Sequence, residues 1–171
     1  MALGSLQQQQ QPQQRKWLSI HHGVVELSEN GRKQSFSYVE GRLLSIYRKT
    51  RNYNGEDVEK WFIDLKDEEG DLYSISFPYS SGTFKSIVLA LASWESLNAT
   101  TTTRIEPYQK NNFTNVKVWA DGNKLNWVVS ELPPVEAVTI GGKTIKDETK
   151  RMSYISSLVE QINQRAKRSE K

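Results

Sequence analysis

Turn dipeptides restrict the fold of this chain more than any other feature, because they separate short segments of period-two hydrophobicity. Asn30-Gly31 and Asp121-Gly122 each lie between two strand-like runs, a combination that strongly favours a two-residue β-hairpin turn. Trp61, Ile63 and Leu65 recur at every second position, which predicts a strand with one buried face. We therefore expect a mainly β protein.

The periodicity predicts this order of elements: a hairpin over residues 20–39, a long strand from residue 36 to about 53, strands over 58–66 and 73–77, a helix over about 81–97, and strands over 100–110, 113–120 and 124–129. Gly41 lies in the middle of the long strand, where glycine permits a sharp bend. Ser80 or Ser81 can cap the helix through its hydroxyl. The chain thus carries one amphipathic helix within a run of strands.

This order is the topology of the OB fold, a five-stranded Greek-key barrel. We therefore expect an OB-fold domain over residues 17–134, with the helix between barrel strands 3 and 4 and an N-terminal β-hairpin extension. A generic β-sandwich, or another small barrel with one inserted helix, is the competing interpretation.

Two segments outside this domain differ in composition. Residues 1–16 are rich in glutamine and lack apolar periodicity, so we expect a disordered tail. Residues 135–171 are expected to form an extended connector, containing Gly141-Gly142, and then an amphipathic C-terminal helix from Asp147. We expect that helix to dock on the barrel or on a partner, and self-association is one alternative. Its apolar stripe consists of Met152, Ile155, Leu158, Val159, Ile162 and Ala166.

Composition excludes several classes of function. The chain has no cysteine, which rules out disulfides, thiol catalysis and cysteine-based metal sites. It has no apolar run near the roughly 20 residues of a membrane span. We therefore expect no membrane partner and a soluble protein of the cytoplasm, the host cytoplasm if a phage encodes it. No nucleophile motif such as Gly-x-Ser-x-Gly is present, so we expect no enzyme, no cofactor and no metal.

Three features that could suggest a catalytic or metal site have simpler explanations. Residues 137–144 end like a phosphate-binding loop, but Ala137 stands where the first glycine belongs. His21 and His22 are adjacent on a predicted strand and point to opposite faces, so they do not bind one ion together. The carboxylates between Asp64 and Asp71 cluster around a predicted hairpin turn, where acidic residues are common and would repel DNA.

Charge is distributed unevenly around a net value of +3, since residues 1–53 hold 8 basic and 3 acidic side chains and residues 54–72 hold 2 and 8. Cations and aromatic rings alternate on the outward faces of the predicted strands. Cations bind phosphates and rings stack on bases, so this pattern predicts a single-stranded DNA site. Ser74 and Ser76 are small enough to leave room for a base. The predicted site residues are Tyr47, Lys49, Arg51, Tyr53, Lys60, Phe62, Tyr108, Lys110, Phe113, Lys117 and Trp119.

The chain also resembles the OB-fold single-stranded DNA-binding proteins of bacteriophages, in the runs YVEGRLLSI at 38–46, WFIDL at 61–65, GDLY at 70–73, IEPY at 105–108 and VKVW at 116–119. The resemblance implies non-catalytic, largely sequence-independent binding and protection of single strands. It further implies a role in phage DNA replication, recombination or repair, with proteins of those processes as partners. Residues 165–171 depart from the family, because they are mostly basic where many members carry an acidic, partner-recruiting tail.

Three alternatives stay open. The same domain can serve as a protein-interaction or virion structural module without nucleic-acid binding, because one fold hosts many functions. RNA is an alternative ligand, since rings and cations do not by themselves detect a 2′-hydroxyl. Rings and cations also occur on strands simply because rings pack across strands and cations are solvated.

Overall fold

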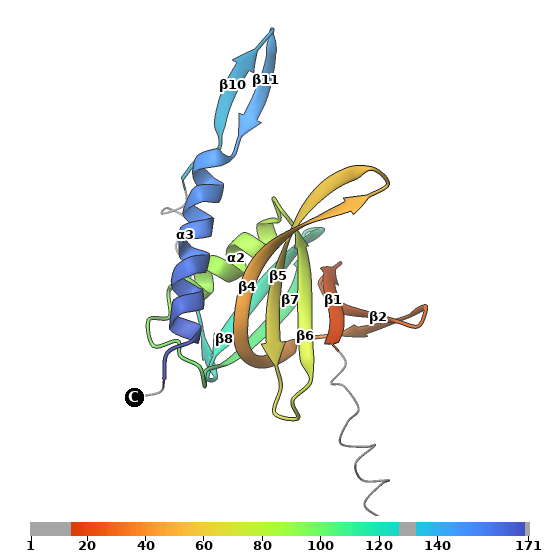
Figure 1. Ribbon diagram of the computed structural model, residues 1–171, viewed down its shortest axis with the longest axis vertical. Coiled ribbons are helices and arrows are strands. Elements are labelled where there is room, and N and C mark those ends of the chain that lie inside the picture. Colours follow the sequence, from red (N-terminus) through yellow and green to blue (C-terminus); the bar gives the residue numbers. More distant parts are fainter. Residues whose placement is uncertain (1–14, 127–132, 170–171) are drawn as a thin grey trace, which may run out of the picture.

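The computed structural model describes residues 15–126 and 133–169, and within them the protein is mainly β. One open, mixed sheet contains β1 (Arg15–His21), β2 (Val24–Glu29), β3 (Arg32–Phe36), β4 (Val39–Tyr53), β5 (Glu56–Lys66), β6 (Leu72–Pro78), β7 (Thr102–Lys110), β8 (Phe113–Ala120) and β9 (Asn123–Lys124). Their order across the sheet is β3-β2-β1-β6-β5-β4-β7-β8-β9. Two helices lie against this sheet, and a separate two-stranded hairpin projects from the end of one of them (Figure 1).

The N-terminal region contains one turn more than the sequence predicted. The β2–β3 hairpin turns at Asn30-Gly31 as expected. A further tight turn at His22-Gly23 separates β1 from β2. A Cβ atom on Gly23 would lie 2.7 Å from the backbone nitrogen of Gln109. Glycine is therefore required here by the close approach of the strand that contains Gln109, in addition to the local turn. β1 begins at Arg15, inside the predicted tail, and residues 1–14 of that tail lie outside the described residues.

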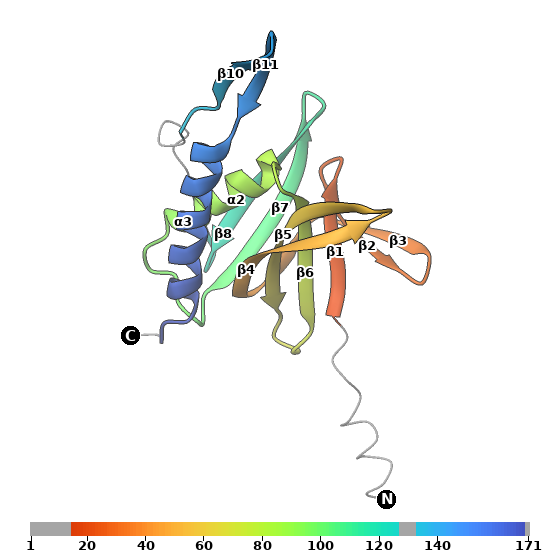
Figure 2. The ribbon, with the colours of Figure 1, turned by 45° about the horizontal axis from the view of Figure 1, so that its top comes forward.

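The predicted closed five-stranded barrel is wrong, because another strand occupies the edge at which it would close. Closure would require the edge strands β6 and β8 to pair. Instead β1 pairs in parallel with β6, so that Arg15–Ser19 run beside Leu72–Ser76. The β1–β2 turn reaches the far side of the curled sheet, where the Gly23 N–H donates to Thr114 Oγ1 at 3.2 Å (Figure 2). In the described residues the sheet is curled but open.

β4 is the long bent strand that the sequence predicted, although it begins at Val39 and does not continue from β3. Gly41 packs so closely on β5 that a Cβ atom there would lie 2.8 Å from the Lys66 carbonyl oxygen. The pairing register with β5 then shifts between Leu43 and Ser45, and such a bulge bends a strand. The bend carries the second half of β4, together with β5, into a hairpin that projects from the sheet (Figure 1).

The strands after the first helix follow the prediction. β7 and β8 pair along almost their whole length, and β8 turns into β9 at Asp121-Gly122, where both residues have positive φ. β9 contains two residues, and part of the predicted strand over 124–129 lies outside the described residues.

The core lies between the inner face of the sheet and the helices α2 (Gly82–Ala92) and α3 (Thr149–Ala166). Ser81 caps α2 by accepting a backbone N–H with its Oγ, and this helix ends earlier than predicted. The predicted apolar stripe of α3 is buried, and the Asn163 amide binds both the N–H and the C=O of Ile46 at 2.8 Å. Docking of α3 on the sheet is therefore confirmed. None of the described helices is both long and apolar enough to cross a membrane.

The predicted extended connector over 137–146 is instead a β-hairpin. β10 (Glu136–Ile140) pairs with β11 (Lys143–Asp147) around Gly141-Gly142. Both glycines have positive φ, as a two-residue hairpin turn requires. The hairpin projects from the N-terminal end of α3, away from the sheet (Figure 1).

Candidate nucleic-acid interface

The predicted site residues of β4 and β5 lie on one outward face of the sheet. The register pairs Tyr47 with Phe62 and Lys49 with Lys60, and paired residues direct their side chains to the same face. The remaining predicted residues of β4 follow at spacing two. β1 adds a cation and a ring to this face. We call the group the β4–β5 patch, and it consists of Arg15, Trp17, Tyr47, Lys49, Arg51, Tyr53, Lys60 and Phe62.

Trp17 contributes an exposed ring that was not among the predicted site residues. Its side chain is 44% exposed, and its ring meets Phe62 edge-to-face with 6.1 Å between centroids. Parallel pairing places Trp17 beside Ser74, so Trp17 occupies the space that Ser74 and Ser76 were expected to leave for a base. The signal that could have found it is the spacing of Arg15 and Trp17, which repeats the cation–ring alternation of β4.

Phe62 forms the floor of the patch. Its side chain is only 2% exposed, and it stacks on Tyr47 with 5.4 Å between ring centroids and 16° between ring planes. Phe62 therefore holds Tyr47 and Trp17 in place and offers no face of its own to a base. Its predicted role in binding becomes one of supporting the neighbouring rings.

Four cations of the patch lie close to its rings. The Arg51 guanidinium carbon is 5.4 Å from the ring centroids of both Trp17 and Phe62, and that of Arg15 is 5.6 Å from Trp17. Lys49 lies 5.4 Å from the ring of Tyr47 and Lys60 lies 5.5 Å from that of Tyr53. These are cation–π distances, and they leave the charged groups at the protein surface beside exposed rings.

One buried carboxylate orients the polar groups of the patch. Asp64 Oδ1 accepts hydrogen bonds from the Tyr47 hydroxyl at 3.2 Å and from the Ser74 hydroxyl at 2.6 Å. Arg15 Nη1 lies 3.6 Å from Asp64 Oδ2 and 3.3 Å from the Tyr47 hydroxyl. Burial, followed by the negative charge of Asp64, raises the pKa of Tyr47. The Tyr47 phenol is thus neutral at physiological pH. Stacking on Phe62 fixes its ring, and the hydrogen bond to Asp64 fixes its hydroxyl.

The predicted residues of β7 and β8 form a second group on their own outward face. The register pairs Tyr108 with Asn115 and Lys110 with Phe113, and Lys117 lies 5.4 Å from the Tyr108 ring. Phe113 is 72% exposed. We call this group the β7–β8 patch, and it consists of Arg104, Tyr108, Lys110, Phe113, Lys117 and Trp119.

Two members of the β7–β8 patch are less accessible to a ligand, one because it is paired and one because it is half-buried. Arg104 forms an ion pair with Glu40 at 2.8 Å and lies 4.1 Å from the Tyr38 ring centroid. The Trp119 side chain is half-buried, and its indole nitrogen is buried without a hydrogen-bond partner among the described residues. Tyr108, Lys110, Phe113 and Lys117 are therefore the members that remain available to a ligand.

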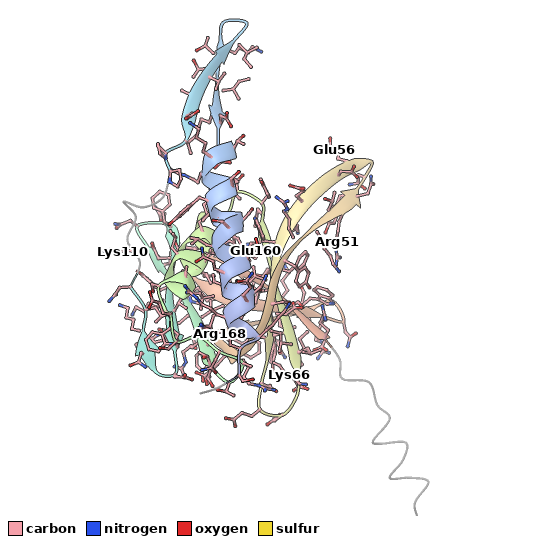
Figure 3. The ribbon with its side chains drawn as sticks, turned by 60° about the vertical axis from the view of Figure 1, so that its left-hand side comes forward. Arg51, Glu56, Lys66, Lys110, Glu160 and Arg168 are labelled. Atoms are coloured by element: carbon pink, nitrogen blue, oxygen red, sulfur yellow. The ribbon has the colours of Figure 1, made fainter. Side chains whose placement is uncertain are left out.

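The two patches do not form the single groove that the sequence predicted. β7 pairs with β4 only over Val39–Arg42, before β4 bends into the hairpin that carries the β4–β5 patch. Among the described residues, no hydrogen bond, ion pair or ring contact joins one patch to the other. Figure 3 shows Arg51 and Lys110 on opposite sides of α3.

No protein-family model, curated protein or solved structure matches this chain. The chemistry of the chain's own residues therefore indicates what it binds. In the β4–β5 patch, that chemistry is the combination of two exposed rings with four cations.

The acidic turn lies at the opposite end of β5 from the β4–β5 hairpin tip. Asp67 Oδ1 accepts the backbone N–H groups of Glu69 and Asp71 at 3.0 and 2.9 Å. The Tyr73 hydroxyl donates to Asp67 Oδ2 at 3.0 Å. Burial and this hydrogen bond raise the pKa of Tyr73 to about 12. The carboxylates thus close a turn, and their charge makes this end of the sheet unfavourable for phosphates.

Proposed function

We propose that the chain binds single-stranded DNA on the β4–β5 patch, without catalysis and largely without sequence preference. The observation that carries this proposal is the exposed Trp17 ring with the Arg51 and Arg15 guanidinium groups beside it. A single strand exposes both phosphates and base faces, so a site for it needs cations and flat rings together. Every base has a π-face, and stacking on Trp17 and Tyr53 would therefore tolerate any sequence.

The order of elements supports the proposal. β4, β5, β6, α2, β7 and β8 follow one another as the strands and helix of an OB fold do. OB folds bind oligonucleotides across their second and third strands and beside the loop between strands 1 and 2. The β4–β5 patch lies on strand 2 and on the hairpin between strands 1 and 2, and β1 takes part in it beside strand 3. We therefore propose an OB-type sheet in which β1 lies beside the third strand, at the edge where a closed barrel would be completed.

The biological role that fits this binding mode is protection of single strands in phage DNA replication, recombination or repair, in the host cytoplasm. It follows from the resemblance of the sequence to phage single-stranded DNA-binding proteins. Replication or recombination proteins would be the partners.

The test is a titration of the full chain with three ligands: oligothymidine, an oligouridine of the same length, and duplex DNA. Tryptophan fluorescence reports binding, and the titration is repeated at several salt concentrations. We expect strong quenching by single strands, a weak response to duplex and a logarithmic salt slope of about −0.7 per phosphate contact. Equal affinity for the RNA oligomer would extend the ligand class to RNA. Absence of binding at low salt would contradict the proposal and favour a protein-interaction or virion structural module.

A matched pair of variants locates the binding surface. Arg51→Ala removes the guanidinium group that Trp17 and Phe62 share. Arg32→Ala removes an exposed cation of the same kind on β3. We expect Arg51→Ala to weaken binding of single strands and Arg32→Ala to leave it nearly unchanged. Equal effects of the two variants would mean that binding reflects the net charge of the protein and not this patch.

A further inference from the structure

The β10–β11 hairpin is a protruding arm with almost no packing of its own. All residues of β10 and all but the last residue of β11 are exposed. The arm extends beyond the N-terminal end of α3 and away from the sheet in both ribbon views (Figures 1 and 2). A two-stranded hairpin alone is marginally stable in water at best. An exposed arm of this kind is therefore expected to be covered by another surface.

The two faces of the arm differ in chemistry. The register pairs Val138 with Ile145 and Ile140 with Lys143, which places three branched aliphatic side chains on one face. Val138, Ile140 and Ile145 are 36%, 63% and 52% exposed. The opposite face carries small and polar residues: Ala137, Thr139, Thr144 and Lys146. One face of the arm is thus an unpartnered apolar surface.

This apolar face carries a positive charge at one end and negative charges at the other. Lys143 lies at the tip, beside the Gly141-Gly142 turn, and the register places Glu136 opposite Asp147 at the root. Glu136 also forms an ion pair with Lys150 Nζ at 2.6 Å, so the two carboxylates and this one cation leave the root with a net negative charge. The aliphatic residues lie between these opposite charges. Hydrogen bonds from Thr149 lower the pKa of Asp147, so its carboxylate is ionised at neutral pH.

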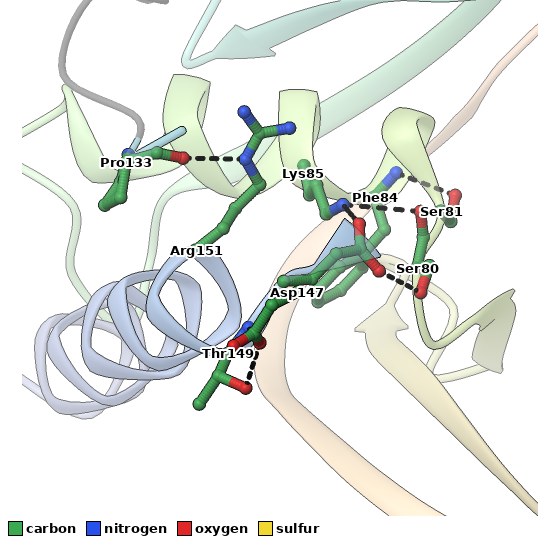
Figure 4. A network of polar contacts seen from close by, with 9 residues as sticks. Ser80, Ser81, Phe84, Lys85, Pro133, Asp147, Thr149 and Arg151 are labelled. Carbon is green, nitrogen blue, oxygen red and sulfur yellow. Dashed lines mark hydrogen bonds and ion pairs between the residues drawn. The ribbon is translucent and has the colours of Figure 1, made fainter. Parts of the chain in front are cut away.

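The root of the arm is tied to the body of the protein and does not act as a loose linker. The Glu148 carboxylate, between β11 and α3, accepts hydrogen bonds from Lys85 Nζ at 3.1 Å and Ser80 Oγ at 2.8 Å. Arg151 Nε donates to the Pro133 carbonyl at 2.8 Å (Figure 4). The arm is therefore anchored at its root to the segment around the start of α2.

We propose that the arm is a self-association element, through which two copies of the chain pack their apolar faces together around a two-fold axis. The partner that this face fits is a second copy of itself, because an antiparallel arrangement brings the Lys143 tip of each arm to the Glu136 and Asp147 root of the other. Both copies then use the same patch, as a two-fold interface requires. The aliphatic side chains of both arms fill the space between the two charged ends.

Sedimentation velocity of the full chain over a wide concentration range tests this directly. We expect a concentration-dependent dimer, and Ile140→Ser should weaken it at least about tenfold, because Ile140 is the most exposed aliphatic side chain of this face and the variant removes its burial against the partner. A chain that remains monomeric at every concentration would overturn the proposal. A dimer that Ile140→Ser does not weaken would overturn it as well, since a different surface would then form the contact.

A matched charge reversal separates the two faces of the arm. Lys143→Glu and Lys146→Glu make the same change in charge, but only Lys143 lies on the apolar face. We expect Lys143→Glu to weaken the dimer and Lys146→Glu to leave it intact. Tryptophan emission monitors folding in both variants, because the arm contains no tryptophan. Equal effects of the two reversals would contradict a face-specific interface.

A mixing experiment tests the antiparallel arrangement itself. Lys143→Glu should fail to form a stable dimer, because the new carboxylate opposes the Glu136 and Asp147 carboxylates of the partner at both ends. Glu136→Lys should weaken the dimer less, because the Asp147 carboxylate remains at the root. An equimolar mixture of the two variants brings unlike charges together at positions 143 and 136 and should form a tighter dimer than either variant alone. If the mixture dimerises no more tightly than the better of the two variants, the antiparallel arrangement is wrong. Neither outcome depends on DNA binding, so the result is independent of the proposed function.

Discussion

The β4–β5 and β7–β8 patches use the same residue types at the same spacing, yet they form different surfaces. In the first, Arg51 lies against two rings and β1 adds Trp17 and Arg15. In the second, Phe113 is open to solvent and Arg104 is paired with Glu40. The difference comes from the neighbouring strands. β1 and β6 extend the first surface, whereas in the described residues the short β9 is the one strand beyond β7–β8. Both patches contain rings and cations, but the β4–β5 patch packs them more closely together than the β7–β8 patch does.

The largest expected difference between the patches is in stability. Phe62→Ala should lower the free energy of unfolding by about 3–5 kcal/mol, because it empties a buried site beneath Tyr47 and Trp17. Phe113→Ala should change it by no more than about 0.5 kcal/mol, since that ring is exposed. Urea denaturation followed by tryptophan fluorescence measures both. Similar losses in the two variants would show that the β7–β8 patch is also packed.

The next largest difference is expected in affinity for single-stranded DNA. Trp17→Ala should weaken binding of oligothymidine by roughly five- to a hundredfold, which is the contribution of one stacked base to the affinity. Tyr108→Ala should weaken it by less than about threefold, because fewer cations surround that ring. Fluorescence anisotropy of a labelled oligomer measures both affinities. A larger effect of Tyr108→Ala would move the principal site to the β7–β8 patch.

Salt dependence sharpens the comparison of the cations. Lys49→Ala should reduce the logarithmic salt slope by about 0.7, the contribution of one phosphate contact on single strands. Arg104→Ala should reduce it less, because the Glu40 carboxylate already neutralises that guanidinium group. Titrations at several salt concentrations give both slopes. Equal reductions would show that a ligand separates Arg104 from Glu40.

The smallest expected effect concerns the Tyr47 hydroxyl. The pKa of Tyr47 is raised in the folded state, so the stability it contributes is present below its ordinary pKa of 10.0 and is lost as pH rises through the raised value. Tyr47→Phe should cost about 1 kcal/mol at neutral pH through loss of the hydrogen bond to Asp64. It should also lessen the fall in unfolding free energy above pH 10. Urea denaturation between neutral pH and pH 11 compares the variant with the natural chain, and an identical fall in both would contradict this assignment.

Several features of the fold follow from local rules and could be predicted. Asn30-Gly31 and Asp121-Gly122 form the expected turns, and Ser81 caps α2. Period-two alternation correctly placed Tyr47 and Phe62 on one face of neighbouring strands. The turns and the cap depend on residues within a few positions of one another, and the shared face follows from alternation along two strands that one short hairpin joins, so each is visible in the sequence.

One failed prediction was local, since Gly141-Gly142 was expected in an extended connector and forms a hairpin turn. The other failed predictions involve segments far apart in the chain. Phe62 alternates with core residues and was expected to be exposed, but Trp17 covers it. The predicted barrel failed for the same reason, because β1 occupies the free edge of β6.

The sequence by itself thus determined the strands from β4 to β8, the two described helices, the turns at Asn30-Gly31 and Asp121-Gly122 and the faces on which rings and cations lie, because turn chemistry and side-chain periodicity act over short distances. Only the tertiary structure decided which strands became neighbours. Strands pair through backbone N–H and C=O groups, which all residues except proline carry. The side-chain pattern therefore does not specify which strand will pair with the edge of a sheet. That pairing brought Trp17 into the β4–β5 patch, buried Phe62 beneath it and separated the patch from β7–β8.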